Sequence, residues 1–164
     1  MGIRRLMSAG LIIVLMSLAG CGFTLRGSDD GSLPIDRLTV TFANSLHPLQ
    51  APLSRYLSSY DVELVPRNAS DFELLISNEA IEQQTVSLNT RAGAGQYELR
   101  LSVEAALHLN GTLMAGPELF EAQGNFFEDT ANIGGSQSGR EIALDDLRQE
   151  LAQQIVIRLQ AIEI

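Results

Sequence analysis

The chain has no lysine and only one cysteine, Cys21, among its 164 residues. All 11 basic residues are therefore arginines, and with 20 acidic residues the formal net charge is −9. A charge this negative argues against nucleic-acid binding and against broad electrostatic attachment to anionic lipid. It leaves room for a local phosphate site, because the planar guanidinium group matches phosphate oxygens. The simpler explanation of the acidic balance is solubility or adaptation to salt.

A single cysteine excludes an internal disulfide, so burial of apolar side chains has to hold the fold together. The patterns typical of enzymes are also missing. Neither His47 nor His108 has a partner at metal-ligand spacing, and no serine stands in a nucleophile elbow. The glycines near Gly93 and Gly134 do not match a phosphate-binding loop. We therefore expect a protein that is not an enzyme and that holds no metal or separate cofactor.

The first 21 residues have the pattern of a lipoprotein signal peptide. Arg4 and Arg5 precede an apolar run, residues 11–16, that is too short to span a bilayer. Leu-Ala-Gly at 18–20 then leads into Cys21, whose thiol can accept a diacylglyceryl group. We expect residues 1–20 to be cleaved, which changes the charge to 9 − 20 = −11 because two arginines are lost. The alternative is an ordinary secretory signal followed by a chance cysteine.

The rest of the chain divides into a tether and one domain. Residues 28–32 are small and polar, so we assign residues 21–32 to a lipidated N-terminus and flexible tether. Residues 33–164 are enough for one hydrophobic core and too few for two. We expect them to form a single domain.

The first half of this domain alternates strand and helix patterns. Residues 38–42 alternate between apolar and threonine side chains, which predicts a half-buried strand. Pro52 suits the first position of a short amphipathic helix that reaches Tyr60. Residues 62–65 predict a second short strand. A strand, a helix and a strand with short links predict a parallel pair of strands.

The middle of the domain is rich in strands. Residues 72–88 predict one long strand with an irregularity near residues 78–84, and residues 92–95 predict a hairpin turn. The strictest alternation in the chain, residues 97–109, predicts a strand with one apolar face on the core and one polar face. Residues 110–117 predict a connection that leads to a last strand at about residues 119–127.

The C-terminal part predicts a loop followed by a helix. Glycine and serine dominate residues 133–139, which favours a flexible loop. Beyond it, apolar side chains recur every three or four residues from Leu144 to Ile162. Acidic residues lie in the expected first turns of this helix and Arg158 lies near its end, as the helix dipole favours.

The motifs together resemble one family of bacterial lipoproteins. The lipobox followed by Cys-Gly-Phe-Thr-Leu-Arg-Gly at 21–27 resembles the mature N-terminus of the LptE family, which assembles lipopolysaccharide at the outer membrane. Later features follow the order of the family: Pro-Leu-Ser-Arg at 52–55, Val-Glu-Leu at 62–64, a long hairpin, Phe-Phe at 126–127 and a terminal helix. The resemblance covers essentially the whole mature chain.

This resemblance implies a fold and a function. The fold is α+β, an α/β sandwich with two helices packed on one face of a mixed, mostly antiparallel β-sheet. Family members lie in the lumen of the outer-membrane β-barrel translocon LptD, assist its assembly and help deliver lipopolysaccharide to the outer leaflet. The implied partners are an LptD-type barrel, lipopolysaccharide and the outer membrane, which the protein reaches through the lipid on Cys21. An auxiliary lipoprotein of another envelope transport or barrel-assembly machine is the alternative.

The resemblance also implies two lipopolysaccharide contacts. The family is thought to bind lipopolysaccharide through basic residues at the tip of the long hairpin and in the segment before the terminal helix. Arg91 lies at or next to the first place in the sequence. The second place, around Ser136, is not basic here, and the nearest cation is Arg140. We therefore expect Arg91 and Arg140 to bind phosphate groups, the alternative being two solvated arginines.

Overall fold

The computed structural model describes residues 33–88, 95–128 and 133–162. The chain divides into two units, and the second unit, Ser32–Ile164, contains every described residue. The expected signal peptide, Cys21 and the whole tether lie outside the described part, and so does Arg91. Their assignments therefore stay predictions from the sequence.

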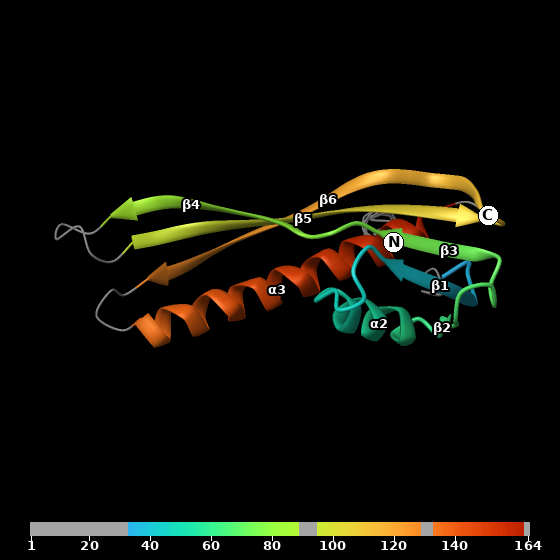
Figure 1. Cartoon of the computed structure of the whole chain (residues 1–164), viewed down its shortest axis with the longest axis horizontal. Coiled ribbons are helices and arrows are strands. Elements are labelled where there is room, and N and C mark those ends of the chain that lie inside the picture. Colours follow the sequence, from blue (N-terminus) through green and yellow to red (C-terminus); the bar gives the residue numbers. More distant parts are fainter. Residues whose placement is uncertain (1–32, 89–94, 129–132, 163–164) are drawn as a thin grey trace, which may run out of the picture. The chain divides into compact units, whose positions relative to one another are not determined.

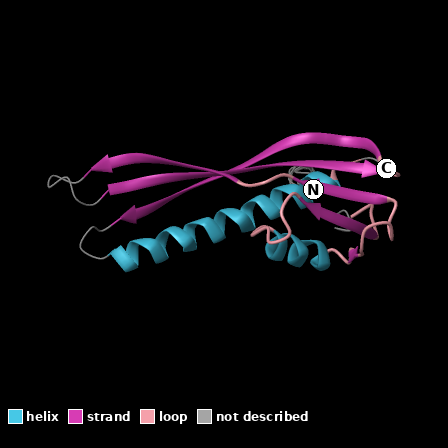
Figure 2. Ribbon diagram, in the orientation of Figure 1, coloured by secondary structure: helices cyan, strands magenta, loops and turns pink. Residues whose placement is uncertain are grey.

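A six-stranded sheet and two helices make up the described domain (Figure 1). In chain order the elements are β1 (Arg37–Phe42), α2 (Gln50–Ser59), β2 (Glu63–Leu64), β3 (Phe72–Ile76), β4 (Ala80–Leu88), β5 (Gly95–Leu109), β6 (Thr112–Glu128) and α3 (Ile133–Gln160). Strand β1 pairs in parallel with β2 and β3, and the other strand pairs are antiparallel. Both helices lie on the same side of the sheet (Figure 2). The predicted fold class is confirmed.

Strand β5 is the centre of the sheet. It pairs with β6 along one edge, and along its other edge it pairs first with β4 and then with β3. The buried residues of β5 alternate, as the sequence predicts: Leu99, Leu101, Val103, Ala105 and Leu107. The other face of the strand carries no helix. This alternation therefore decides which face of the sheet belongs to the core.

Helix α3 packs a stripe of apolar side chains against the apolar face of the sheet. The predicted helical spacing is confirmed by a series of buried side chains: Leu144, Leu147, Leu151, Ile155 and Leu159. From α2, Leu53 and Leu57 join the same cluster, together with Leu38 and Leu74 from the sheet. Full burial of one such side chain contributes about 2 kcal/mol, so this cluster supplies the main favourable term in folding.

The predicted parallel strand pair is confirmed, but the helix between the two strands begins earlier than expected. Its first residue is Gln50, so Pro52 occupies the third position and not the first. The position is still compatible with proline, because the first four N–H groups of a helix have no partner within the helix.

The predicted long strand over residues 72–88 is wrong in one respect. It is two strands, β3 and β4, which lie end to end along β5 and are interrupted at residues 77–79. At the interruption the Ser77 N–H donates to Glu104 O (2.9 Å), and the Ser77 hydroxyl accepts from Glu104 N–H (2.8 Å). A second irregularity, at Val86, shifts the register between Thr85 and Ser87. The two hydrogen bonds of Ser77 therefore continue the pairing with β5 at the point where the chain departs from β geometry.

The predicted connection over residues 110–117 is much shorter in the structure. Only Asn110 and Gly111 form the turn, both with positive φ (51° and 78°), as the favoured two-residue hairpin requires. Strand β6 begins at Thr112 and continues through Gly116-Pro117, where its register against β5 shifts. A proline is tolerated there because β6 pairs with only one neighbour in the described sheet, so its other edge needs no N–H donor.

The predicted loop at residues 133–139 is wrong. These residues form the first two turns of α3, which is 28 residues long. The acidic residues assigned to the first turns consequently lie further along the helix, whereas Arg158 does occupy the last turn. Local propensity disfavours helix in a run of glycine and serine, but Ser138 donates to Gly134 O (3.1 Å) and Ser136 is buried. Tertiary packing outweighs propensity here.

Gly116 should be the most sensitive glycine of β6. Its φ is +87°, and an added Cβ would lie 2.6 Å from Ala105 O. Gly111 has a similar φ of +78° but open space around the same position. We expect Gly116→Ala to lower the free energy of unfolding by about 3 kcal/mol and Gly111→Ala by about 1 kcal/mol, since only the first adds a clash to the backbone strain. Denaturant titration of both variants checks this, and equal losses would contradict it.

Candidate functional site

The two arginines that the sequence places in a lipopolysaccharide site lie in different parts of the chain. Arg91 belongs to the segment between Leu88 and Gly95, which are paired as the last residues of the β4–β5 hairpin. Its own position lies outside the described residues. Arg140 lies in the third turn of α3 and not in a loop.

Arg140 links α3 to the side of the hairpin. Its Nε donates to Gln83 Oε1 (3.4 Å), its Nη1 lies 3.5 Å from Glu141 Oε1, and its side chain is 33% exposed. Gln83 is five residues before the last paired residue of β4. At about 3.4 Å per residue, Arg140 is therefore attached roughly 17 Å from the end of the paired strands. The fold leaves its guanidinium group accessible but already provided with two weak partners.

The helix-free face of the sheet is lined by polar side chains in cross-strand rows. In one row Arg100 Nη1 lies 3.7 Å from Glu82 Oε2. On its other side, the Gln123 amide oxygen accepts from Arg100 Nε at 3.0 Å when the amide is oriented to satisfy both residues. Glu98 and Asn125 form the next pair along the strands. This face is therefore wet and held together by side-chain hydrogen bonds.

A second polar group lies on this face near the other end of β5. Thr41 Oγ1 donates to Glu73 Oε1 (2.7 Å), and the Arg67 guanidinium donates to the same oxygen (3.1 and 3.2 Å). The hydrogen bond from Thr41, with help from Arg67 and from the charge of His108, holds the pKa of Glu73 below its usual value. Glu73 therefore stays ionised at neutral pH and keeps its ion pair with Arg67.

Three large apolar side chains interrupt the polar face, all from β6. Leu113, Leu119 and Phe127 are 49%, 57% and 74% exposed. Their partners on β5 are His108, Glu104 and Gln96, which places them on the helix-free face. They are separated along the strand by six and eight residues, so each contributes its apolar surface at a different place on this face.

A buried ion pair joins α3 to the interruption between β3 and β4, and sequence reasoning missed it. Arg148 Nε and Nη2 donate to the two carboxylate oxygens of Glu79 (3.0 and 3.2 Å), and Nη1 donates to Asp145 (2.9 Å). The side chains of Arg148 and Glu79 are only 12% and 8% exposed. Burial lowers the pKa of Arg148, but the two carboxylates outweigh it and raise the pKa above the usual value. Only the three-residue spacing of Asp145 and Arg148 was visible in the sequence.

The buried histidine has a structural role. His47 is 4% exposed, its Nδ1 accepts from Leu49 N–H (3.2 Å), and its Nε2 lies 2.9 Å from Ser77 O. These two contacts assign the acceptor role to Nδ1 and the donor role to Nε2. It ties the segment before α2 to the end of β3.

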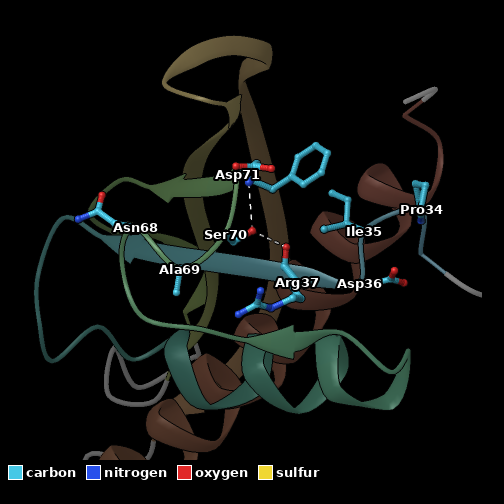
Figure 3. A pocket seen from close by; sticks show the side chains of 9 residues that line it. Pro34, Ile35, Asp36, Arg37, Asn68, Ala69, Ser70 and Asp71 are labelled. Atoms are coloured by element: carbon cyan, nitrogen blue, oxygen red, sulfur yellow. Dashed lines mark hydrogen bonds between the residues drawn. The ribbon is translucent and has the colours of Figure 1, made fainter.

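An open pocket lies where β1 and β3 begin, and it contains none of the predicted site residues (Figure 3). It has a volume of about 410 Å³ and is lined by residues 34–37 and 68–72. The Ser70 hydroxyl donates to Arg37 O (2.6 Å) and accepts from Phe72 N–H (3.1 Å). It therefore links the segment before β3 to the first residue of β1. Nothing in the lining forms a catalytic arrangement.

Over the described ranges we also find no group of three metal-ligating side chains and no helix with the length and apolar character of a membrane span.

Comparison with known families gives one match. The model of the LptE family, described as lipopolysaccharide-assembly, matches residues 35–159. Among curated proteins, the LPS-assembly lipoproteins LptE of Yersinia pestis (strain Pestoides F) and Yersinia pseudotuberculosis (serotype O:1b) are each 24% identical to this chain. Each match covers 95% of this chain and 76% of the relative.

Solved structures share the fold. A lipoprotein B from Nitrosomonas europaea has a TM-score of 0.68 at 22% identity, with 85% of this chain and 91% of that chain covered. A minor lipoprotein from Acinetobacter baumannii has a TM-score of 0.66 at 20% identity, with 79% and 93% covered. The rare lipoprotein B from Shewanella oneidensis has a TM-score of 0.64 at 22% identity, with 75% and 92% covered. At these identities the likeness concerns the fold alone.

Breaking the buried ion pair should be costly. We expect Arg148→Met to lower the free energy of unfolding by about 3 kcal/mol, because it leaves the Glu79 carboxylate buried without its cation. Arg140→Met is the matched control in the same helix, and its loss should stay within about 0.5 kcal/mol because its contacts are long and exposed. Denaturant titration measures both. Recovery of part of the loss in Glu79→Gln/Arg148→Met would support the pairing, and equal effects of the two single variants would contradict it.

Proposed function

The chain belongs to the lipopolysaccharide-assembly LptE family, and from this premise we propose that it plugs an LptD-type outer-membrane β-barrel, assists the assembly of that barrel and helps lipopolysaccharide reach the outer leaflet. The family is not enzymatic; its members are LPS-assembly lipoproteins. Binding and assembly, and not catalysis, are therefore the activities to test.

The observation that supports the plug role is the polar, helix-free face of the sheet. Its rows of hydrogen-bonded side chains, such as Glu82, Arg100 and Gln123, suit a water-filled barrel whose inner wall is polar. The exposed apolar side chains on β6, such as Phe127, offer contacts with side chains of the barrel wall.

The proposal includes an anchor in the outer membrane. Cleavage after Gly20 would leave Cys21 as the first residue, carrying diacylglyceryl and an N-acyl chain. Several acyl chains give stable attachment where one chain gives only marginal binding. No other cofactor is needed. The lipid would keep the domain at the membrane before it meets its barrel, and Gly22 in the following position is consistent with outward sorting.

The second candidate is an auxiliary lipoprotein of another envelope transport or barrel-assembly machine. It would share the lipobox and a small α/β domain. The family match over residues 35–159 favours the lipopolysaccharide role, because it includes both helices' buried stripes and the long hairpin.

Affinity purification tests the proposal directly. When the tagged lipoprotein is purified from detergent-solubilised outer membrane, we expect a large β-barrel to be recovered in about equal molar amount and to persist through washing. Mass spectrometry identifies the companion. A preparation in which the lipoprotein is intact but no barrel is recovered would reject the plug role and favour the second candidate.

We also propose that Arg91, with a smaller contribution from Arg140, binds phosphate groups of lipopolysaccharide. Loss of one charge-assisted hydrogen bond corresponds to roughly tenfold weaker binding, so Arg91→Glu should weaken binding by about that factor or more. Arg140→Glu should have less effect, because this guanidinium is shared with Gln83 and Glu141. Arg55→Glu on α2 is the control for net charge. Binding to immobilised lipopolysaccharide is measured, and an unchanged affinity for Arg91→Glu would reject the site.

A further inference from the structure

The described sheet has three free strand edges, and two of them are protected. The edge of β2 consists of only two residues, Glu63 and Leu64. The free edge of β6 is bridged by α3, from which Gln154 donates to the main-chain oxygen of Glu121 (3.1 Å) and Arg158 pairs with Glu118 (2.7 Å). Proteins commonly protect strand edges in these two ways, by shortness or by a covering element.

The third edge, that of β4, is open. Residues 80–87 are all exposed, and β4 pairs only with β5 within the described part. The strand has no proline, and its one charge, Glu82, is paired with Arg100. Arg140 reaches the side-chain amide of Gln83 and not the main chain. The register shift at Val86 is the single feature that interrupts this edge.

The hydrogen-bond pattern identifies the unpaired main-chain groups. Ser77 N–H donates to Glu104 O, and Asn110 N–H donates to Asp71 O, so the even-numbered residues of β5 bond towards the edge that holds β3 and β4. Antiparallel ladders alternate between bonded and non-bonded pairs. The β4 residues opposite even positions of β5 are Ala80, Glu82 and Gln84. The residues whose N–H and C=O groups face the free edge are therefore Ile81, Gln83 and Thr85.

We propose that this edge binds an extended polar segment of the barrel partner as an added β-strand, through main-chain hydrogen bonds. The inference rests on the proposed function for the identity of the partner. Water can satisfy such a row of exposed N–H and C=O groups in the free protein, and the alternating spacing of the row matches the backbone of another extended strand. The exposed side chains of Ile81 and Val86 (41% and 54%) flank a polar centre made by Gln83, Gln84 and Thr85, so we expect the added strand to be polar at its centre.

Charge argues against a second copy of this chain as the occupant. The mature chain has an expected net charge of −11, from 9 arginines and 20 acids, and two copies would repel each other. Pairing β4 with itself would also bring two Glu82 carboxylates to one small sheet. Neither the repulsion between acidic copies nor the approach of two Glu82 carboxylates applies to a neutral or basic segment of the barrel.

Proline substitution at Gln83 tests the edge directly. Gln83→Pro removes an N–H that points outward and no bond to β5, whereas Gln83→Thr keeps the N–H, and both variants lose the contact with Arg140. In the tagged full-length lipoprotein purified from outer membrane, we expect Gln83→Pro to recover about fivefold less barrel than Gln83→Thr. Gln83→Thr should match the wild type.

Two further measurements distinguish the loss of the edge contact from a loss of folding. Gln84→Pro removes a bond to Glu98, so its unfolding midpoint should fall well below that of Gln83→Pro, which should stay close to that of Gln83→Thr. Hydrogen exchange needs no variant: the amides of Ile81, Gln83 and Thr85 should exchange rapidly in the free lipoprotein and slowly in the complex. Rapid exchange of all three in the complex would overturn the inference.

The outcomes separate this inference from the proposed function. If the wild-type lipoprotein recovers no barrel, both fail. If Gln83→Pro and Gln83→Thr recover the same amount, whether full or reduced, the added strand is rejected while the plug role stands. If light scattering of the purified lipoprotein shows a dimer that Gln83→Pro dissociates, the edge serves a second copy and the barrel segment is rejected.

Discussion

The structure depends on one contact above all, the burial of the apolar face of β5 under α3. Leu99, Leu101 and Val103 from the strand and Leu151 and Ile155 from the helix are all at most 1% exposed, and they belong to one cluster. Because β5 pairs with three other strands, fixing its face fixes theirs. A shift of register by one residue would turn the apolar set to water and is therefore strongly disfavoured. The opposite face carries the polar side chains of the same strand, and it is the face that we propose to meet the barrel.

The Arg148–Glu79 pair adds specificity to this packing. Apolar burial alone is not directional and would allow α3 to shift along the sheet. The bidentate hydrogen bond from Arg148 to Glu79 fixes the position of the helix relative to the sheet. The pair lies where β3 ends and β4 begins, and His47 ties the segment before α2 to Ser77 in the same region. The β4–β5 hairpin therefore begins at a point of the sheet that is held by contacts with α3 and with the segment before α2.

The distribution of free surface fits a protein that acts by binding. Six of the arginines in the described part are paired with acidic side chains: Arg37, Arg67, Arg100, Arg140, Arg148 and Arg158. Most of the positive charge is therefore used within the fold. What the domain presents outward is a hydrogen-bonded polar sheet face and an open strand edge. Both are suited to a polar protein wall more than to a small-molecule substrate.

The sequence by itself determined the buried face of β5 and the apolar stripe of α3, because each follows from side-chain periodicity along one element. The order strand, helix, strand predicted the parallel pair of β1 and β2. The fold class followed from the family resemblance that the sequence carries. Tertiary structure alone decided the rest. Residues 133–139 are helical although glycine and serine disfavour it, since packing against the sheet outweighs local propensity. Strand β6 continues past Gly116-Pro117 because its edge needs no donor there. Glu79 and Arg148 are 69 residues apart in the chain, and no local pattern connects two charges that meet only when helix and sheet are packed.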